Sequence, residues 1–312
     1  MSNEVVVSAY CLAYNHEQYI KSALEGFVSQ KTDFKYEVFV HDDASTDKTA
    51  DIINQYAKRY PNIIKPILQK ENQYSKGVDI SQEIIFPRMK GKYVAICEGD
   101  DYWCDNNKLQ KQVDFLEKNK EYSACVHNTL QLNCKSGLKS YINESNIDMD
   151  LKFSKVVERG NSQFQLSSLV CRKDLFVVPE EMKANGFGDY PLAIYLMFNG
   201  KIRYFKETMS VYRLFSEGSW TSKNYLNVSP FKQVETQKDI IDFLNKLYIY
   251  CQENQMDQEY LNEIEKVLRV QNAEMLFIKK DGYHLIKNYK DVYNSYPWKK
   301  KLKVIFPFLR NC

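Results

Sequence analysis

The chain has 312 residues, 44% of them hydrophobic and 27% charged, which is the balance of a globular protein large enough for one sizeable core. A formal net charge of +3, without a basic stripe before about residue 290, argues against a nucleic-acid partner. Charged residues interrupt every apolar segment, so no membrane span is expected.

The N-terminus and the cysteines predict a cytoplasmic protein. The opening MSNEVVVSAY lacks the charged-then-apolar pattern of a signal peptide. The eight cysteines include no C-x-x-C pair, so we expect reduced thiols and no zinc cluster.

Short apolar runs alternate with helical patterns in the first 120 residues. Strands are predicted over residues 5–9, 36–41, 63–68 and 93–97. Helices are predicted over 17–30, 49–56, 80–89 and 108–119, the second capped from within 45–47. This alternation is typical of an α/β fold with a largely parallel sheet covered by helices.

The rest of the chain changes character near residue 225. Residues 122–212 mix short strands, loops and one helix near 191–198, whereas 229–290 are almost wholly helical and broken only at Gly282. We therefore predict a domain over 1–225 and a helical extension over 226–312, which ends in the basic and aromatic tail PWKKKLKVIFPFL.

Three polar loops follow predicted strands. CLAYNH follows the first strand, DDASTD the second and EGDD the fourth. Ligands of open α/β sheets bind beyond the carboxyl ends of the strands, so these loops predict one site at one sheet edge.

The acids of EGDD are the most specific feature of that site. Glu98, Asp100 and Asp101 crowd like charges after an apolar strand, and carboxylates are the ligands that Mg²⁺ or Mn²⁺ take together with substrate phosphates. The alternative is that the two aspartates cap the turn before Trp103.

For three other candidate site residues, a structural role explains the sequence as well as a functional role does. Asp43 either holds a ligand or forms an Asx turn. Asp189, before Pro191, is either a general base or a helix cap. Arg213 lies before a glycine-containing loop and either meets phosphate or lies on a surface loop.

In this order and spacing, the motifs resemble those of the family 2 glycosyltransferases of bacterial surface polysaccharide synthesis. The matching stretches are VVVSAYCLAYN, YEVFVHDDASTDKT, GKYVAICEGDDYW and KLQKQ, and the likeness is close over residues 4–120 and looser to about 222. The resemblance implies the GT-A fold, a Rossmann-like mixed sheet flanked by helices, with a nucleotide-sugar half over 1–120 and an acceptor half over 121–225.

The resemblance also implies residue roles. Asp43 would hold the nucleotide base, and Glu98, Asp100 and Asp101 would bind the ribose and the metal that bridges the diphosphate. The metal ligand would be Asp101 or Asp100. The first loop would border the nucleotide through Leu12, Ala13, Tyr14 and Asn15.

The acceptor side carries one match and one departure. Asp189 matches the base that relatives place before a helix. Relatives often carry Y-R-x-H, whereas this chain has Phe215 in the last position, so Arg213, Ser216 or Trp220 would serve the leaving group instead.

The function implied is that of an inverting, metal-dependent hexosyltransferase. It would use Mn²⁺ or Mg²⁺ and move a sugar from a nucleotide sugar, expected to be a UDP sugar, to a saccharide or lipid-linked saccharide acceptor of capsule or lipopolysaccharide. The alternatives are a catalytically silent nucleotide-sugar-binding relative and, more distantly, a nucleotidyltransferase.

The tail leaves two interpretations open. Its lysines and bulky apolar residues could contact an anionic membrane, at the inner face of the plasma membrane, or form a helix packed on the domain or in a homodimer. No nucleic-acid partner is expected.

Overall fold

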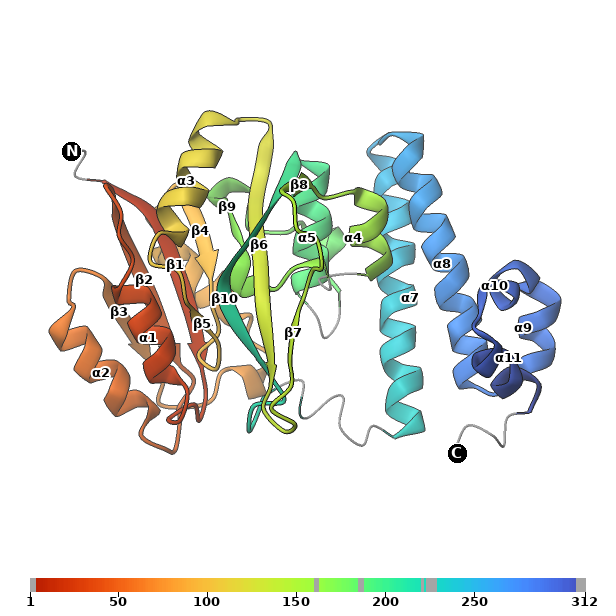
Figure 1. The fold of residues 1–312 in the computed structure, drawn as a ribbon, viewed down its shortest axis with the longest axis horizontal. Helices are drawn as coiled ribbons and strands as arrows, with labels where there is room; N and C mark the ends of the chain where they lie inside the picture. Colours follow the sequence, from red (N-terminus) through yellow and green to blue (C-terminus); the bar gives the residue numbers. More distant parts are fainter. Residues whose placement is uncertain (1–3, 160–162, 185–187, 220–221, 223–228, 307–312) are drawn as a thin grey trace.

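The computed structural model describes residues 4–159, 163–184, 188–219, 222 and 229–306. Its body is one mixed sheet (Figure 1). The described strands are β1 (Val5–Ala13), β2 (Lys35–Asp42), β3 (Ile64–Leu68), β4 (Tyr93–Ile96), β5 (Tyr102–Trp103), β6 (Tyr122–Asn133), β7 (Lys139–Tyr141), β8 (Met149–Asp150), β9 (Val170–Arg172) and β10 (Lys201–Leu214).

The sheet joins a parallel part to a mixed part. Its order is β3-β2-β1-β4-β9-β6-β10-β5, with β7 on β6 and β8 on β10. The first four strands of this order run parallel, β9 is antiparallel to both its neighbours, β6 and β10 are parallel, and β5 closes the edge antiparallel to β10. The predicted mixed sheet flanked by helices is confirmed.

Side-chain alternation along the strands gives the sheet a core on each face. On β1, Val7, Ala9 and Cys11 point into one core, and Tyr10 points into the other. The first core is covered by α1 (Ile20–Val28), α2 (Thr49–Arg59) and α3 (Lys108–Lys118). The second is covered by the π-helical turn η2 (Ile80–Ile85), α4 (Phe153–Arg159), α5 (Asp189–Phe198) and the two helices described next.

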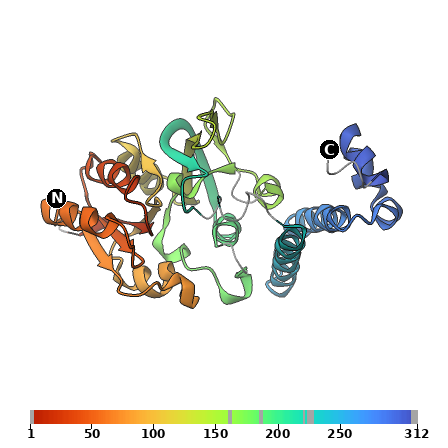
Figure 2. The same cartoon turned by 90° about the horizontal axis from the view of Figure 1, so that it is seen from below.

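The helical extension has two parts. Helices α7 (Pro230–Glu253) and α8 (Gln258–Ile278) share the second core, through residues such as Phe243 and Ile264. Beyond them, α9 (Gly282–Asn288), α10 (Lys290–Ser295) and α11 (Trp298–Ile305) pack with the last turns of α8 in a small separate cluster, at the end of the molecule away from the sheet (Figure 2). Because the second core continues into α7 and α8, the division near residue 225 stays a prediction.

One helix prediction was wrong. We expected Gly282 to be the only break after residue 229, but α7 ends at Glu253 and α8 begins at Gln258, with four residues between them. Asn254 follows the last helical residue and Gln255 adopts a left-handed φ of 51°, so the polar ENQMD segment turns the chain back. The turn lets both helices pack on the same core.

None of the helices within the described ranges is both long enough and apolar enough to span a bilayer.

A buried lysine was not foreseen from the sequence. Lys108 is the first residue of α3 and is 0% exposed, with its Nζ 4.4 Å from the centroid of the Trp103 ring. Nζ finds no hydrogen-bond partner among the described residues. Burial lowers the pKa of Lys108 from 10.5 to about 7, because the charged form is desolvated.

Replacing Lys108 by methionine should change how stability depends on pH. Between about pH 7 and 10.5 the unfolded chain binds a proton at Lys108 that the native state does not, so this residue makes stability rise with pH by about 1.4 kcal/mol per pH unit. Urea unfolding at several pH values should show Lys108→Met more stable near pH 7, with the difference narrowing as pH rises. Parallel stability curves for the two proteins would contradict the buried, neutral lysine.

Candidate active site

The three predicted loops meet at the carboxyl edge of the parallel strands. Strand β1 lies between β2 and β4, so its end reaches both neighbouring loops. The Gly99 N–H donates to the Leu12 carbonyl at 2.9 Å, and the Asp43 N–H donates to the Ala13 carbonyl at 2.9 Å. The end of β1 therefore fixes the positions of the acidic turn, residues 98–101, and of the loop after β2 that begins at Asp43.

Gly99 permits the close approach of the acidic turn to β1. A Cβ at this position would lie 2.8 Å from His16 Nδ1 and 3.0 Å from the Leu12 carbonyl oxygen. Any larger residue would push the turn away from β1, so the glycine of EGDD is required by packing.

The loops after β1 and β2 are joined to each other. Asn15, at a left-handed φ of 55°, donates its backbone N–H to Ser45 Oγ at 2.9 Å and accepts the Thr46 N–H on Oδ1 at 2.8 Å. Asp47 Oδ2 accepts the Glu17 N–H at 3.0 Å. Asn15 thus holds the two loops together. The side chain of the neighbouring Tyr14 is 40% exposed.

Asp43 lies buried beneath a third segment. Its two carboxylate oxygens accept the backbone N–H groups of Gln73, at 2.7 Å, and Tyr74, at 3.0 Å. The side chain therefore orders residues 72–74, which sequence reasoning did not connect to the site. Asn72 Nδ2 also donates to the Asp43 carbonyl oxygen at 3.1 Å, so this segment lies against the end of β2.

The two aspartates of the acidic turn differ in burial and in hydrogen-bond partners. Asp101 is 5% exposed, and its Oδ1 accepts the backbone N–H of Arg213 at 2.8 Å, which ties the turn to the end of β10. Asp100 is half-buried, and its Oδ2 accepts the buried Ser216 hydroxyl at 2.6 Å. Burial and the charge of Asp100 raise the pKa of Asp101, against the opposing effect of the Arg213 N–H.

The Arg213 side chain clamps the back of the acidic turn. Its Nη1 donates to the Asp100 carbonyl at 2.6 Å and its Nη2 to Ser22 Oγ at 3.2 Å. The guanidinium carbon lies 5.3 Å from the ring centroid of Tyr19 and 4.6 Å from that of Tyr102. Arg213 is thus held between two rings and two acceptors, a positioning role that its motif alone did not reveal.

Asp189 is the first residue of α5 and lies close enough to the acidic turn for its charge to act on Glu98. Burial raises the pKa of Asp189, opposed by hydrogen bonding from the Tyr190 N–H. The negative charges of Asp100 and Asp189 add to burial in raising the pKa of Glu98 to about 8. Burial raises the pKa of the Tyr10 hydroxyl on β1, and the charges of Glu98 and Asp189 add to this effect.

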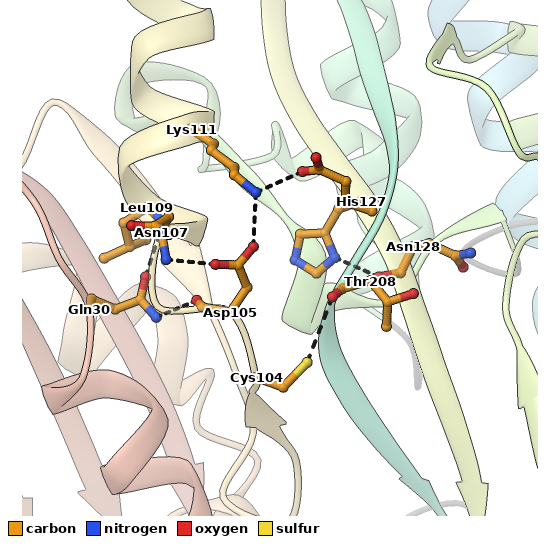
Figure 3. A network of polar contacts seen from close by, with 10 residues as sticks. Gln30, Cys104, Asp105, Asn107, Leu109, Lys111, His127, Asn128 and Thr208 are labelled. Carbon is orange, nitrogen blue, oxygen red and sulfur yellow. Dashed lines mark hydrogen bonds and ion pairs between the residues drawn. The ribbon is translucent and has the colours of Figure 1, made fainter.

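A polar network holds the segment that follows the acidic turn (Figure 3). Gln30, after α1, donates through Nε2 to the Asp105 carbonyl at 2.9 Å and accepts the Leu109 N–H on Oε1 at 3.1 Å. Lys111 pairs with Asp105 at 3.0 Å and with Glu207 on β10 at 2.9 Å. These contacts hold the start of α3, and the segment that leads to it from the acidic turn, against the end of α1 on one side and β10 on the other.

The site could hold a divalent metal only together with substrate phosphates. Among the residues that the structure describes, no three His, Cys, Asp or Glu side chains form a cluster that could hold a metal ion alone. The half-buried Asp100 carboxylate, with further acids close by, fits instead the Mg²⁺ or Mn²⁺ arrangement in which one or two carboxylates are completed by substrate phosphates and water.

The structure thus brings together most of the predicted site residues. Those at the sheet edge are Leu12, Ala13, Tyr14, Asn15, Asp43, Glu98, Asp100, Asp101, Asp189 and Arg213. Trp220 lies outside the described residues. Sequence reasoning missed Ser22 and Gln73, which had no motif around them.

Comparison with known proteins identifies the family. The model of glycosyl transferase family 2 matches residues 8–155, a span that contains the loops after β1, β2 and β4. This part of the chain belongs to that family. It contains the acidic turn and the parallel strands β1, β2, β3 and β4.

Two curated relatives are similar in sequence. An uncharacterized protein of Mycobacterium tuberculosis is 36% identical over 217 residues, which are 69% of this chain and 61% of the relative. The poly(ribitol-phosphate) beta-glucosyltransferase of Bacillus spizizenii is 29% identical over 181 residues, 57% of this chain and 27% of that enzyme. The chain therefore spans about three fifths of the first relative and about a quarter of the second.

Two solved structures share the fold. S. aureus TarS 1-349 in complex with UDP-GlcNAc superposes with a TM-score of 0.60 at 19% identity, covering 96% of this chain and 79% of that one. The mannosyltransferase PcManGT from Pyrobaculum calidifontis, in complex with GDP-Man and Mn²⁺, gives a TM-score of 0.55 at 15% identity, covering 99% and 81%. The predicted GT-A fold of the glycosyltransferase is confirmed by these likenesses.

Proposed function

We propose that this family 2 glycosyltransferase is an inverting, metal-dependent hexosyltransferase that uses a nucleotide sugar. The observation that carries the proposal is the gathering of acids from two parts of the fold: Glu98 of the acidic turn lies close enough to both Asp100 and Asp189, the first residue of α5, for their charges to act on its carboxyl. One side of this edge offers sites for a diphosphate and a cation, and the other offers a base for an acceptor.

Asp100 is our choice for the metal ligand. The Asp101 carboxylate is buried and accepts a backbone N–H of β10, so it supports the turn, whereas Asp100 is more exposed. Glu98, in the position of the usual first aspartate, would lie beside the ribose. A bound Mn²⁺ or Mg²⁺ would supply charge neutralisation for the diphosphate leaving group. The PcManGT complex with Mn²⁺ supports a metal at this kind of fold.

Asp189 would act as the general base. Burial makes its carboxylate more basic than an exposed aspartate, because desolvation disfavours the charged form. The carboxylate would take the proton of the acceptor hydroxyl as that oxygen attacks the anomeric carbon opposite the nucleotide. A single displacement of this kind inverts the configuration, so an α-linked donor gives a β-linked product.

The donor is proposed to be a UDP sugar and the acceptor a saccharide or lipid-linked saccharide of a bacterial surface polysaccharide. The UDP-GlcNAc complex of TarS and the beta-glucosyltransferase name of the B. spizizenii relative support this choice. Asp43 and the loop of Leu12 to Asn15 would contact the nucleotide. Arg213 would keep the turn in place while the diphosphate binds.

The test is a thermal-shift screen of UDP and GDP sugars with and without Mn²⁺. The correct donor should raise the melting temperature only when metal is present. A ligand that binds the native state and not the unfolded chain stabilises the protein, by about 2.7 kcal/mol at a concentration of 100 times Kd. Shifts that do not need metal would contradict the metal-dependent site. Donor binding without transfer to any acceptor would favour a silent relative.

A further inference from the structure

Helix α11 displays an apolar stripe that the fold leaves facing outward. Trp298 is 66% exposed, Leu302 38% and Ile305 50%. These residues are four and three positions apart, so they line one side of the helix. Phe306, the residue that caps the helix, follows them and is 44% exposed.

The stripe is not the surface that attaches α11 to the protein. Val304 is 1% exposed and packs with Leu285 and Val292 in the small cluster of the last three helices. The approach is close at this point, since a Cβ on Gly282 would lie 2.5 Å from the Val304 carbonyl oxygen. The inner side of α11 therefore holds the helix in place, and the apolar stripe lies on the opposite side.

Lysines border the stripe on both sides. On a helical projection Lys299 falls on one side of Trp298 and Leu302, and Lys301 on the other. Lys300 belongs to the inner side, where it pairs with Glu274 at 2.5 Å. The segment from residue 295 to 306, SYPWKKKLKVIF, contains no acidic residue, so its charge is uniformly positive.

We propose that this face of α11 lies in the headgroup region of an anionic bilayer. A tryptophan at one end, aliphatic side chains along the stripe and lysines beside them are the composition of helices that rest in a membrane interface. Each lysine near an anionic surface contributes attraction, which falls with ionic strength. The helix has only eight residues, so binding is reversible.

A second copy of the chain fits this face less well. Two such helices packed through their stripes would bring two sets of lysines together, and lysine is depleted from protein interfaces. The last three helices lie at the end of the molecule away from the sheet (Figure 2), so membrane contact leaves the catalytic edge uncovered. If the function proposed above holds, this contact keeps the enzyme near a lipid-linked acceptor; this last step rests on that proposed function.

Vesicle flotation of the full chain tests the proposal. We expect binding to phosphatidylglycerol-containing vesicles, weaker binding at high salt and little binding to phosphatidylcholine alone. The double variant Lys299→Gln/Lys301→Gln should weaken binding roughly 25-fold, about fivefold for each lysine. Lys58→Gln/Lys70→Gln, a pair of exposed lysines on the sheet domain, is the matched control and should bind as the parent does.

The apolar stripe has its own pair of variants. Trp298→Ser/Leu302→Ser should lose vesicle binding, whereas Phe231→Ser, which removes a 78% exposed phenylalanine from the start of α7, should keep it. Equal binding by all variants would overturn the proposal. So would a dimer in light scattering that only the stripe variant dissociates, since that assigns the face to a second copy.

Failure of the membrane proposal can be distinguished from failure of the proposed function. The stripe and lysine variants should keep the parental melting temperature and the metal-dependent shift with the nucleotide sugar, which shows that they are folded. Vesicle binding without any donor shift would reject the glycosyltransferase proposal and leave the membrane face intact. A donor shift without vesicle binding in the parent would reject the membrane face alone.

Discussion

Asp189→Asn should lower the rate of sugar transfer by roughly 10²–10⁴-fold while leaving donor binding unchanged. Asparagine keeps the size and polarity of the side chain at the start of α5 but cannot accept the proton of an acceptor hydroxyl. The measurement pairs the initial rate of transfer with the melting-temperature shift produced by donor and Mn²⁺. A lost rate with an intact shift is the result expected of a missing base.

The matched control for Asp189 is Asp281→Asn. Asp281 also begins a helix, accepting the His284 N–H at 3.1 Å as the cap of α9, but it is in the small cluster of the last three helices. This variant should transfer sugar at the parental rate. Transfer by Asp189→Asn at that same rate would show that Asp189 is only a residue of the first helical turn.

Asp100→Asn should remove the response to Mn²⁺, and Asp101→Asn should keep it. Replacing the proposed ligand takes away a hard, charged oxygen, and we expect metal-dependent donor binding to weaken by at least about 100-fold. In Asp101→Asn the amide oxygen can still accept the Arg213 N–H, so the turn stays attached to β10. Titration of Mn²⁺ in the presence of donor, followed by melting temperature, compares the two variants.

These two variants are each other's control, because they change the charge of adjacent residues in one turn by the same amount. Both relieve repulsion among the acids, so the metal-free proteins should be no less stable than the parent. If Asp101→Asn loses the Mn²⁺ response and Asp100→Asn retains it, the assignment of the ligand is reversed.

The sheet edge was predictable because its determinants are local. Each apolar strand and the polar loop after it lie within about 15 residues, and parallel strands bring their carboxyl ends to one edge. The motifs around Leu12, Asp43 and Glu98 therefore indicated one site. The helices that cover the sheet followed from apolar spacing in the same way.

The division of roles within the site depended on contacts that no short stretch encodes. Asp101 is buried because β10 returns to pair Ser210 with Trp103, more than 100 residues away in the chain. Lys108 is buried beside the ring of Trp103 on β5, and no feature of the sequence around it indicated this burial. The turn after Glu253 was missed because its residues are polar and not glycine or proline.

The most direct test of the central claim is the stereochemistry of the product. The full chain, incubated with an α-linked UDP sugar, Mn²⁺ and a lipid-linked saccharide acceptor, should release UDP and give a β-linked product, as read by NMR of the anomeric proton. Omission of Mn²⁺ should abolish the product. An α-linked product would contradict a single displacement assisted by Asp189, and release of pyrophosphate would identify a nucleotidyltransferase instead.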